Sequence, residues 1–205
     1  MTRETTMKIL LVGANGTLGR AVAAELRVRH ELIPAGRRTG DVHLDLADAD
    51  SIDAALQSVG PLDAVISAAG HVAFGPLLEL TDVQWHLGLS EKLMGQVNLA
   101  LLAVPHLRDG GSITLTTGVV STDPIRGGAS AAMVNGGLES FVRCAALELP
   151  RGLRINAVSP GVLLESMHEY APLFRGFEPV PAARAALGFA RSVEGGDTGK
   201  TYRLF

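Results

Sequence analysis

The sequence has little of what several classes of protein require. It contains one cysteine, Cys144, so no internal disulfide can form and a cysteine-rich zinc site is excluded. Its 18 basic and 21 acidic residues give a net charge of −3, without the basic excess that is typical of nucleic-acid-binding proteins. No apolar run approaches the roughly 18–20 residues of a membrane helix. These absences exclude a disulfide scaffold and argue against nucleic-acid and membrane partners.

The N-terminal segment also lacks the architecture of a signal peptide, because its short apolar run leads directly into glycines. We therefore expect a cytoplasmic protein. Hydrophobic residues make up 47% and charged residues 19% of the 205 residues, which is ordinary globular usage. A chain of this length usually folds around one core. We expect a disordered extension at residues 1–6 and one domain over residues 7–205.

Short apolar runs alternate with longer helix-type segments along the chain. The strand candidates are residues 8–12, 31–35, 41–44, 63–68, 112–116, 153–158 and 200–204. The helix candidates are residues 17–29, 50–59, 82–107 and 129–149, and Asp48 or Asp50 is the expected cap of the second. Strands joined by crossover helices form a parallel sheet with right-handed connections. The sequence therefore predicts a doubly wound α/β fold of the Rossmann type.

A glycine-rich loop lies between the first strand candidate and the first helix candidate. Its residues are Gly13, Ala14, Asn15, Gly16, Thr17, Leu18 and Gly19. Dinucleotide-binding folds place glycines here for a tight turn, for close approach of the pyrophosphate and for helix packing. The backbone N–H groups at the start of the helix then face the phosphates. We predict a dinucleotide site at this loop; a tight turn without a ligand is the alternative.

The second strand candidate ends in Gly36-Arg37-Arg38, where the adenosine ribose of a dinucleotide would lie. An NAD-preferring site usually has an acid at this turn, whereas arginine accommodates the 2′-phosphate of NADP. The turn contains no acid, so the sequence favours NADP(H) over NAD(H), with a solvated loop as the alternative. Asp45 follows the third strand candidate, where its carboxylate can accept from an adenine amino group or cap the next turn.

Four further motifs accompany the glycine loop. They are Asp45-Leu46, Ser67-Ala68-Ala69-Gly70, Ala146-Leu147-Glu148-Leu149 and Ile155-Asn156-Ala157-Val158-Ser159-Pro160-Gly161. With these motifs, the chain resembles the short-chain dehydrogenase/reductase family over residues 8–204. The resemblance implies a parallel sheet in the order 3-2-1-4-5-6-7. It also implies that the cofactor contacts residues 67–70, Thr116 and the turn of Pro160, Gly161 and Val162, which borders the nicotinamide.

The side chains that catalyse the reaction in this family are absent from the matching positions. The family uses a tyrosine, a lysine four residues later, a serine and an asparagine. An ungapped count places these four positions, in that order, on Ala131, Asn135, Gly118 and Lys92. A shift of one residue would bring Thr117 and Ser130 into the site. No shift supplies a tyrosine, because Tyr170 and Tyr202 both lie far downstream.

Lysine and asparagine therefore occupy each other's expected places. A Lys92 ammonium that points into the site can stabilise an alkoxide or donate its proton, provided that burial lowers its pKa. Thr116, Thr117 and Ser130 are candidates to hold a substrate oxygen, and Asn135 completes the predicted catalytic set. The alternative is that Lys92 is a helical surface residue and that Asn135 is a structural hydrogen-bonding group.

These features favour an NADP(H)-dependent oxidoreductase with a non-standard active site and a small carbonyl, quinone or flavin substrate. The first alternative is a non-catalytic NADP(H)-binding redox sensor or regulatory protein. The second is another reaction on the same scaffold, such as an isomerase or a lyase. The six histidines show no metal-type clustering, so no metal is expected. Small residues on the 129–149 helix favour a homodimer or a homotetramer.

Overall fold

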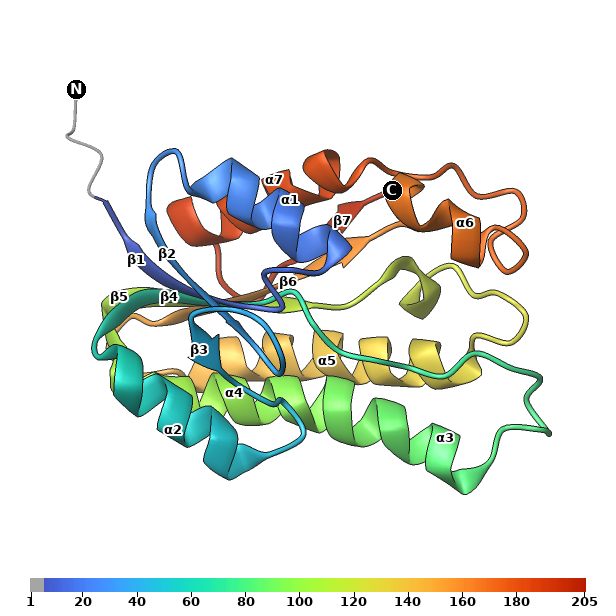
Figure 1. Cartoon of the computed structure of the whole chain (residues 1–205), viewed down its shortest axis with the longest axis horizontal. Coiled ribbons are helices and arrows are strands. Elements are labelled where there is room, and N and C mark those ends of the chain that lie inside the picture. The colour runs from blue at the N-terminus through green and yellow to red at the C-terminus, as the bar shows by residue number, and fades with distance from the viewer. Residues whose placement is uncertain (1–5) are drawn as a thin grey trace.

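A computed structural model describes residues 6–205, and Figure 1 shows how its elements are arranged. Seven parallel strands form one sheet in the order β3-β2-β1-β4-β5-β6-β7. The strands are β1 (Lys8–Val12), β2 (Glu31–Gly36), β3 (Val42–His43), β4 (Leu62–Ser67), β5 (Leu107–Thr116), β6 (Arg154–Pro160) and β7 (Thr201–Leu204). The predicted Rossmann-type fold and strand order are confirmed. Apart from Thr6, the extension expected at residues 1–6 lies outside the described residues.

Helices cover both faces of the sheet (Figure 1). On one face, α1 (Thr17–Leu26) packs beside α7 (Ala182–Glu194) over the apolar side chains of β1 and β4. The other face is covered by α2 (Ala49–Val59), α4 (Gly95–Ala103) and α5 (Ala129–Glu148). The central strand β1 is buried from Ile9 to Val12, which explains its uninterrupted apolar sequence. The predicted cap of α2 is Asp48, whose carboxylate accepts from the Asp50 N–H.

The helix expected over residues 82–107 is divided into four segments. These are α3 (Asp82–Leu87), the π-helical segment η1 (Gly88–Met94), α4 and the 3₁₀ turn η2 (Val104–His106). At Gly88, a Cβ would lie 3.1 Å from a methyl group of Val134, so glycine permits close approach to α5. Pro105 lies in η2, where it ends the helical run. The wide turns of η1 carry Glu91 and Lys92.

The structure corrects the expected position of Cys144 and adds a helix, α7, that the sequence pattern did not predict. Cys144 is exposed, whereas its place among the apolar residues of the helix predicted over residues 129–149 favours a core position. The buried positions of α5 are 130, 131, 134, 135, 138, 139 and 142, and residue 144 lies off this helical face. Helix α7 was not predicted, because its alanine-rich sequence is interrupted by Gly188. That glycine lets α7 approach the sheet, since a Cβ would lie 2.9 Å from Leu204.

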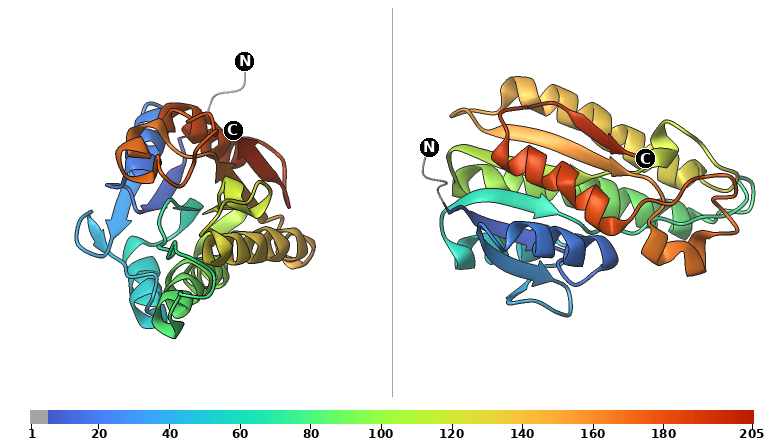
Figure 2. Two further views of the ribbon diagram at one scale, coloured as in Figure 1. Left: turned by 90° about the vertical axis from the view of Figure 1, so that its right-hand side faces the viewer. Right: turned by 90° about the horizontal axis from the view of Figure 1, so that it is seen from above.

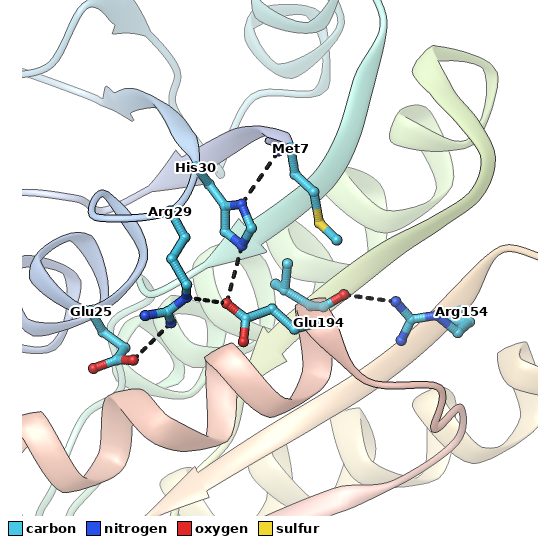
Figure 3. A network of polar contacts seen from close by, with 7 residues as sticks. Met7, Glu25, Arg29, His30, Arg154 and Glu194 are labelled. Atoms are coloured by element: carbon cyan, nitrogen blue, oxygen red, sulfur yellow. Dashed lines mark hydrogen bonds and ion pairs between the residues drawn. The ribbon is translucent and has the colours of Figure 1, made fainter. Parts of the chain in front are cut away.

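A polar network joins α7 and β6 to the segments that precede β1 and β2 at the amino-terminal edge of the sheet (Figure 3). The Glu194 carboxylate on α7 contacts Arg29 Nε at 2.8 Å and His30 Nε2 at 3.1 Å. His30 Nδ1 lies 3.3 Å from the backbone nitrogen of Met7, which precedes β1. Arg154 on β6 donates to the Val193 carbonyl at 2.9 Å. This network fixes the edge of the sheet that lies opposite the predicted site.

The loops that follow β1, β4, β5 and β6 meet at the carboxyl edge of the sheet. Ligands of open α/β sheets bind at this edge. The short helix α6 (Met167–Tyr170) and the start of α3 lie at the same end of the molecule in both figures (Figures 1 and 2). The fold therefore brings the predicted cofactor and substrate residues to one end.

Candidate functional site

The glycine loop after β1 packs without room for side chains at two positions. Gly13 has a φ of +81°, and a Cβ there would lie 2.8 Å from the Ala69 Cβ. At Gly19, a Cβ would lie 2.0 Å from the Gly13 carbonyl oxygen. Gly16 is the N-cap of α1 and provides no side-chain cap. The first N–H groups of α1 therefore lack a side-chain acceptor, which fits the binding of a phosphate group.

A pocket of about 240 Å³ extends from this loop across the ends of β1, β2 and β4. Its lining includes seven residues predicted to bind the cofactor: Gly13, Arg37, Arg38, Asp45, Leu46, Ala69 and Gly70. We call it the cofactor pocket. Asp45 Oδ1 also accepts from the Ala47 N–H at 3.0 Å, so this carboxylate caps the turn before α2 as well. The residues of the pocket fit a dinucleotide with a charged group near Arg37 and Arg38.

Two further residues of the cofactor pocket form an ionic bridge that sequence reasoning missed. The Glu91 carboxylate on η1 lies 2.8 Å from His71 Nδ1 and 3.8 Å from an Arg37 nitrogen. The three side chains come from segments far apart in the sequence. The charge pattern around the glycine motif gave no signal for this bridge, because it depends on how η1 is placed against the loop after β4.

A second pocket, of about 260 Å³, adjoins the first and shares Gly70 and His71 with it. The rest of its lining is Val72, Phe74, Lys92, Val162, Leu163, Ser166, Tyr170 and Phe174. We call it the aromatic pocket, because the rings of Phe74, Tyr170 and Phe174 pack edge to face with centroids 5.9–6.4 Å apart. Burial raises the pKa of the Tyr170 phenol, so that group stays neutral at physiological pH.

Lys92 is the charged side chain of the aromatic pocket. It lies against Gly70, whose φ is +130° and where a Cβ would be 2.9 Å from the Lys92 Cγ. Lys92 is partly buried. Desolvation lowers its pKa from 10.5 to about 8. Lys92 thus lies next to Gly70, which lines both pockets, and its lowered pKa suits proton transfer near neutral pH.

The other predicted catalytic residues are buried behind the pockets. Thr117 donates to the Val158 carbonyl at 3.4 Å. Ser130 Oγ and Asn135 Oδ1 have no hydrogen-bond partner within residues 6–205. The Asn135 amide faces Gly118, where a Cβ would lie 3.1 Å from Nδ2. Thr117, Ser130 and Asn135 therefore line neither pocket. Ala131, at the family's tyrosine position, packs in an apolar cluster with Val119, Val120, Val162 and Phe174.

The remaining predicted cofactor residues surround the glycine loop and the strand ends. Val162 lines the aromatic pocket, and Thr116 Oγ1 donates to the Ser67 carbonyl at 2.5 Å. The Asn15 carbonyl accepts from Arg20 at 2.7 Å. Gly16, Thr17, Leu18, Ala68, Pro160 and Gly161 belong to the loops or element ends at this edge. Within residues 6–205, no group of three or more potential ligands forms a metal site, and no helix is both long and apolar enough to cross a membrane.

Gln96, which sequence reasoning also missed, ties the helices to the end of β5. It is fully buried. Its amide accepts from the Thr116 N–H at 2.8 Å and donates to the Thr116 carbonyl at 2.9 Å. The same amide donates to the Lys92 carbonyl at 3.2 Å. These bonds hold η1, and with it Lys92, in a fixed position against the site.

Replacing Gln96 with leucine is expected to lower the free energy of unfolding by about 2–6 kcal/mol. The change preserves volume but leaves two buried backbone groups of Thr116 unpaired, at about 1–3 kcal/mol each. Urea denaturation measures the loss. The matched control is Gln57→Leu, because Gln57 is exposed on α2 and its removal should change stability by less than about 0.5 kcal/mol. Equal losses in the two variants would contradict the prediction.

The chain matches a family model described as enoyl-(acyl carrier protein) reductase over residues 4–202. Versicolorin reductase 1 of Dothistroma septosporum is 32% identical over 177 residues, which are 82% of this chain and 66% of the reductase. Trans-4-hydroxycyclohexanecarboxylate dehydrogenase of Sinomonas cyclohexanicum is 29% identical and covers 85% of this chain and 71% of its own length. This chain thus spans slightly less than two thirds of the length of the versicolorin reductase.

Two solved structures share the fold across nearly the whole chain. The protein lin1944 from Listeria innocua is 51% identical, with a TM-score of 0.96 over 98% of this chain and 100% of its own. A small-chain dehydrogenase in complex with NADPH is 23% identical, with a TM-score of 0.85 over 98% of this chain and 97% of its own. The matching family model, the strand order and the glycine loop agree: the chain belongs to the short-chain dehydrogenase/reductase family.

Proposed function

We propose that the protein is an NADP(H)-dependent oxidoreductase that acts on a small carbonyl, quinone or flavin-type substrate, with Lys92 in place of the family's tyrosine as the proton donor. The observation that carries the proposal is the junction of two pockets. The cofactor pocket and the aromatic pocket meet at Gly70 and His71, and Lys92 lies against Gly70. The names of the relatives, which are reductases and dehydrogenases, support the same class of reaction.

In this proposal, the α1 N-terminus and the glycine loop hold the pyrophosphate of the cofactor, and Arg37 and Arg38 hold its 2′-phosphate. The nicotinamide supplies the hydride when it is bound. Phe74, Tyr170 and Phe174 exclude water from a flat, apolar substrate. The Lys92 ammonium stabilises the negative oxygen of the substrate and gives it a proton. Quinones and flavins suit this site best, because the anions formed on their reduction are delocalised and depend less on a strong general acid than an alkoxide does.

The first experiment is a calorimetric titration with NADPH, NADP⁺, NADH and NAD⁺. We expect micromolar binding of the phosphorylated forms. Arg37→Ala should weaken NADPH binding by about 10- to 100-fold, because a charge-assisted contact to phosphate contributes about 1.5–3 kcal/mol. Arg184→Ala, at an exposed arginine of α7, is the matched control and should leave binding unchanged. Absence of binding by all four nucleotides would overturn the proposed cofactor.

A non-catalytic NADP(H)-binding sensor is the second candidate. The burial of Thr117, Ser130 and Asn135 away from both pockets favours it, because the site then holds few polar groups for a substrate. Binding of NADPH without oxidation by any member of a panel of quinones, flavins and aryl ketones would favour the sensor. Turnover of any of them would favour the enzyme.

Three further features stay proposals: one domain over residues 7–205, a cytoplasmic location, and assembly into a homodimer or homotetramer. Exposed apolar side chains on α4 and α5, namely Leu101, Met133 and Leu147, support assembly through these helices. Light scattering on a sizing column measures the mass of the assembly, and a mass of one chain would contradict it.

A further inference from the structure

The cofactor pocket carries a carboxylate that works against a phosphorylated ligand. The charged residues of its lining are Arg37, Arg38, Asp45 and Glu91, so two cations face two carboxylates. The Asp45 carboxylate is engaged with the Ala47 N–H. Glu91 instead lies on the opposite wall from β2, on η1, with 20% of its side chain exposed. Any anionic group bound near Arg37 therefore lies close to a second, fixed anion.

The Glu91 carboxylate contacts His71 more closely than it contacts Arg37. His71 Nδ1 lies 2.8 Å from one carboxylate oxygen, which is hydrogen-bond distance. Arg37 lies 3.8 Å from the other oxygen, which is an ionic contact without a hydrogen bond. The Glu91 charge therefore partly neutralises the charge of Arg37, but the N–H donors of the Arg37 guanidinium stay unused and its orientation is not fixed by Glu91. His71 keeps the carboxylate in the pocket, while the Arg37 fork remains free to turn to a stronger anion.

We propose that Glu91 is a specificity-determining residue that restrains the preference for the 2′-phosphorylated cofactor. This inference rests on the proposed function, because it assigns a role within the same nucleotide site. A 2′-phosphate must share Arg37 with Glu91 and meets the repulsion of its charge. A 2′-hydroxyl carries no charge and meets neither penalty. Glu91 therefore lowers the affinity for NADP(H) and leaves that for NAD(H) nearly unchanged.

The test is a titration of Glu91→Gln with NADPH and with NADH. Glutamine keeps the shape of the side chain and removes its charge. We expect NADPH to bind about 2- to 5-fold more tightly, as the loss of one partly exposed ionic contact implies. NADH should change by less than about twofold. The control is Glu148→Gln, at an exposed glutamate at the end of α5, which should leave both affinities unchanged.

A double-mutant cycle separates a contact with Arg37 from a general change of charge. In an Arg37→Ala background, Glu91→Gln should improve NADPH binding by a smaller factor than in the natural background, because the competition for Arg37 is gone and only the repulsion between the carboxylate and the 2′-phosphate remains. An equal gain in both backgrounds would overturn the proposal, as would equal gains for NADPH and NADH. Weaker NADPH binding by Glu91→Gln, with thermal unfolding unchanged, would also overturn it.

His71→Asn provides an independent second variant. Without His71, the carboxylate should turn to Arg37, and NADPH should bind about 2- to 5-fold more weakly; unchanged or tighter binding would contradict the bridge. The outcomes distinguish the two proposals. If Glu91→Gln binds NADPH and the ratio of its affinities for NADPH and NADH is unchanged, only the proposed role of Glu91 is overturned. Absence of binding by the natural protein and by every variant overturns the proposed function, and this inference with it.

Discussion

Replacing Lys92 with methionine is expected to lower NADPH-linked turnover by about 10²–10⁴-fold, which is the usual contribution of a general acid. Methionine matches the length of the lysine stem and preserves its packing against Gly70, so NADPH affinity should change by less than about twofold. The assay follows NADPH oxidation with an aryl ketone, because the alkoxide that forms depends on a proton donor, and with quinones and flavins, for which the loss should be smaller. Lys200→Met, at an exposed lysine before β7, is the control and should retain full turnover.

The pH dependence gives this prediction a second readout. Desolvation lowers the Lys92 pKa to about 8, so the proton-donating ammonium predominates below pH 8. Reduction of the substrate should therefore be fastest below pH 8 and fall above it, whereas the reverse oxidation, which needs the free amine, should rise through the same range. Lys92→Met should lose this inflection. Unchanged turnover, or an inflection that persists in the variant, would remove Lys92 from the chemistry.

The local sequence was sufficient to predict the sheet, and seven of the residues that it suggested for the cofactor line one pocket. The apolar run of β1 and the glycines that follow it reflect requirements of the backbone, and the arginine pair follows β2 directly. These requirements act within a few residues, so pattern reasoning could find them. Asp48 is a similar case, because its cap satisfies an N–H group only two residues away.

Glu91 could not be predicted in the same way. Its partners are 54 and 20 residues distant along the chain, and they meet where the π-helical segment η1 carries Glu91 to within contact of both. The residues before and after Gly88 suggest an unbroken helix, and the π-helical turns depend on close contact with α5. Burial of Ser130 and Asn135 behind the aromatic pocket likewise depends on how α5 rotates against β6, which no spacing in the sequence determines.

Substituting alanine for glycine is expected to destabilise the protein in the glycine loop and to stabilise it on α5. Gly19→Ala is expected to weaken NADPH binding by more than about 100-fold and to lower the free energy of unfolding by about 2–4 kcal/mol. The new Cβ would lie 2.0 Å from the Gly13 carbonyl oxygen, which is backbone and cannot turn aside. The N-terminus of α1 must then move away from the loop, and the N–H groups that face the phosphates move with it.

Gly136→Ala is the matched control, because Gly136 is also a helical glycine. A Cβ at Gly136 meets no described atom within 4 Å, so the substitution should stabilise α5 by about 0.5–1 kcal/mol through its helix propensity and leave NADPH affinity unchanged. Urea denaturation and calorimetric titration of the two variants measure both effects. If Gly19→Ala binds NADPH as tightly as Gly136→Ala does, the loop is not the phosphate site, since a displaced α1 cannot preserve contacts that depend on its first turn.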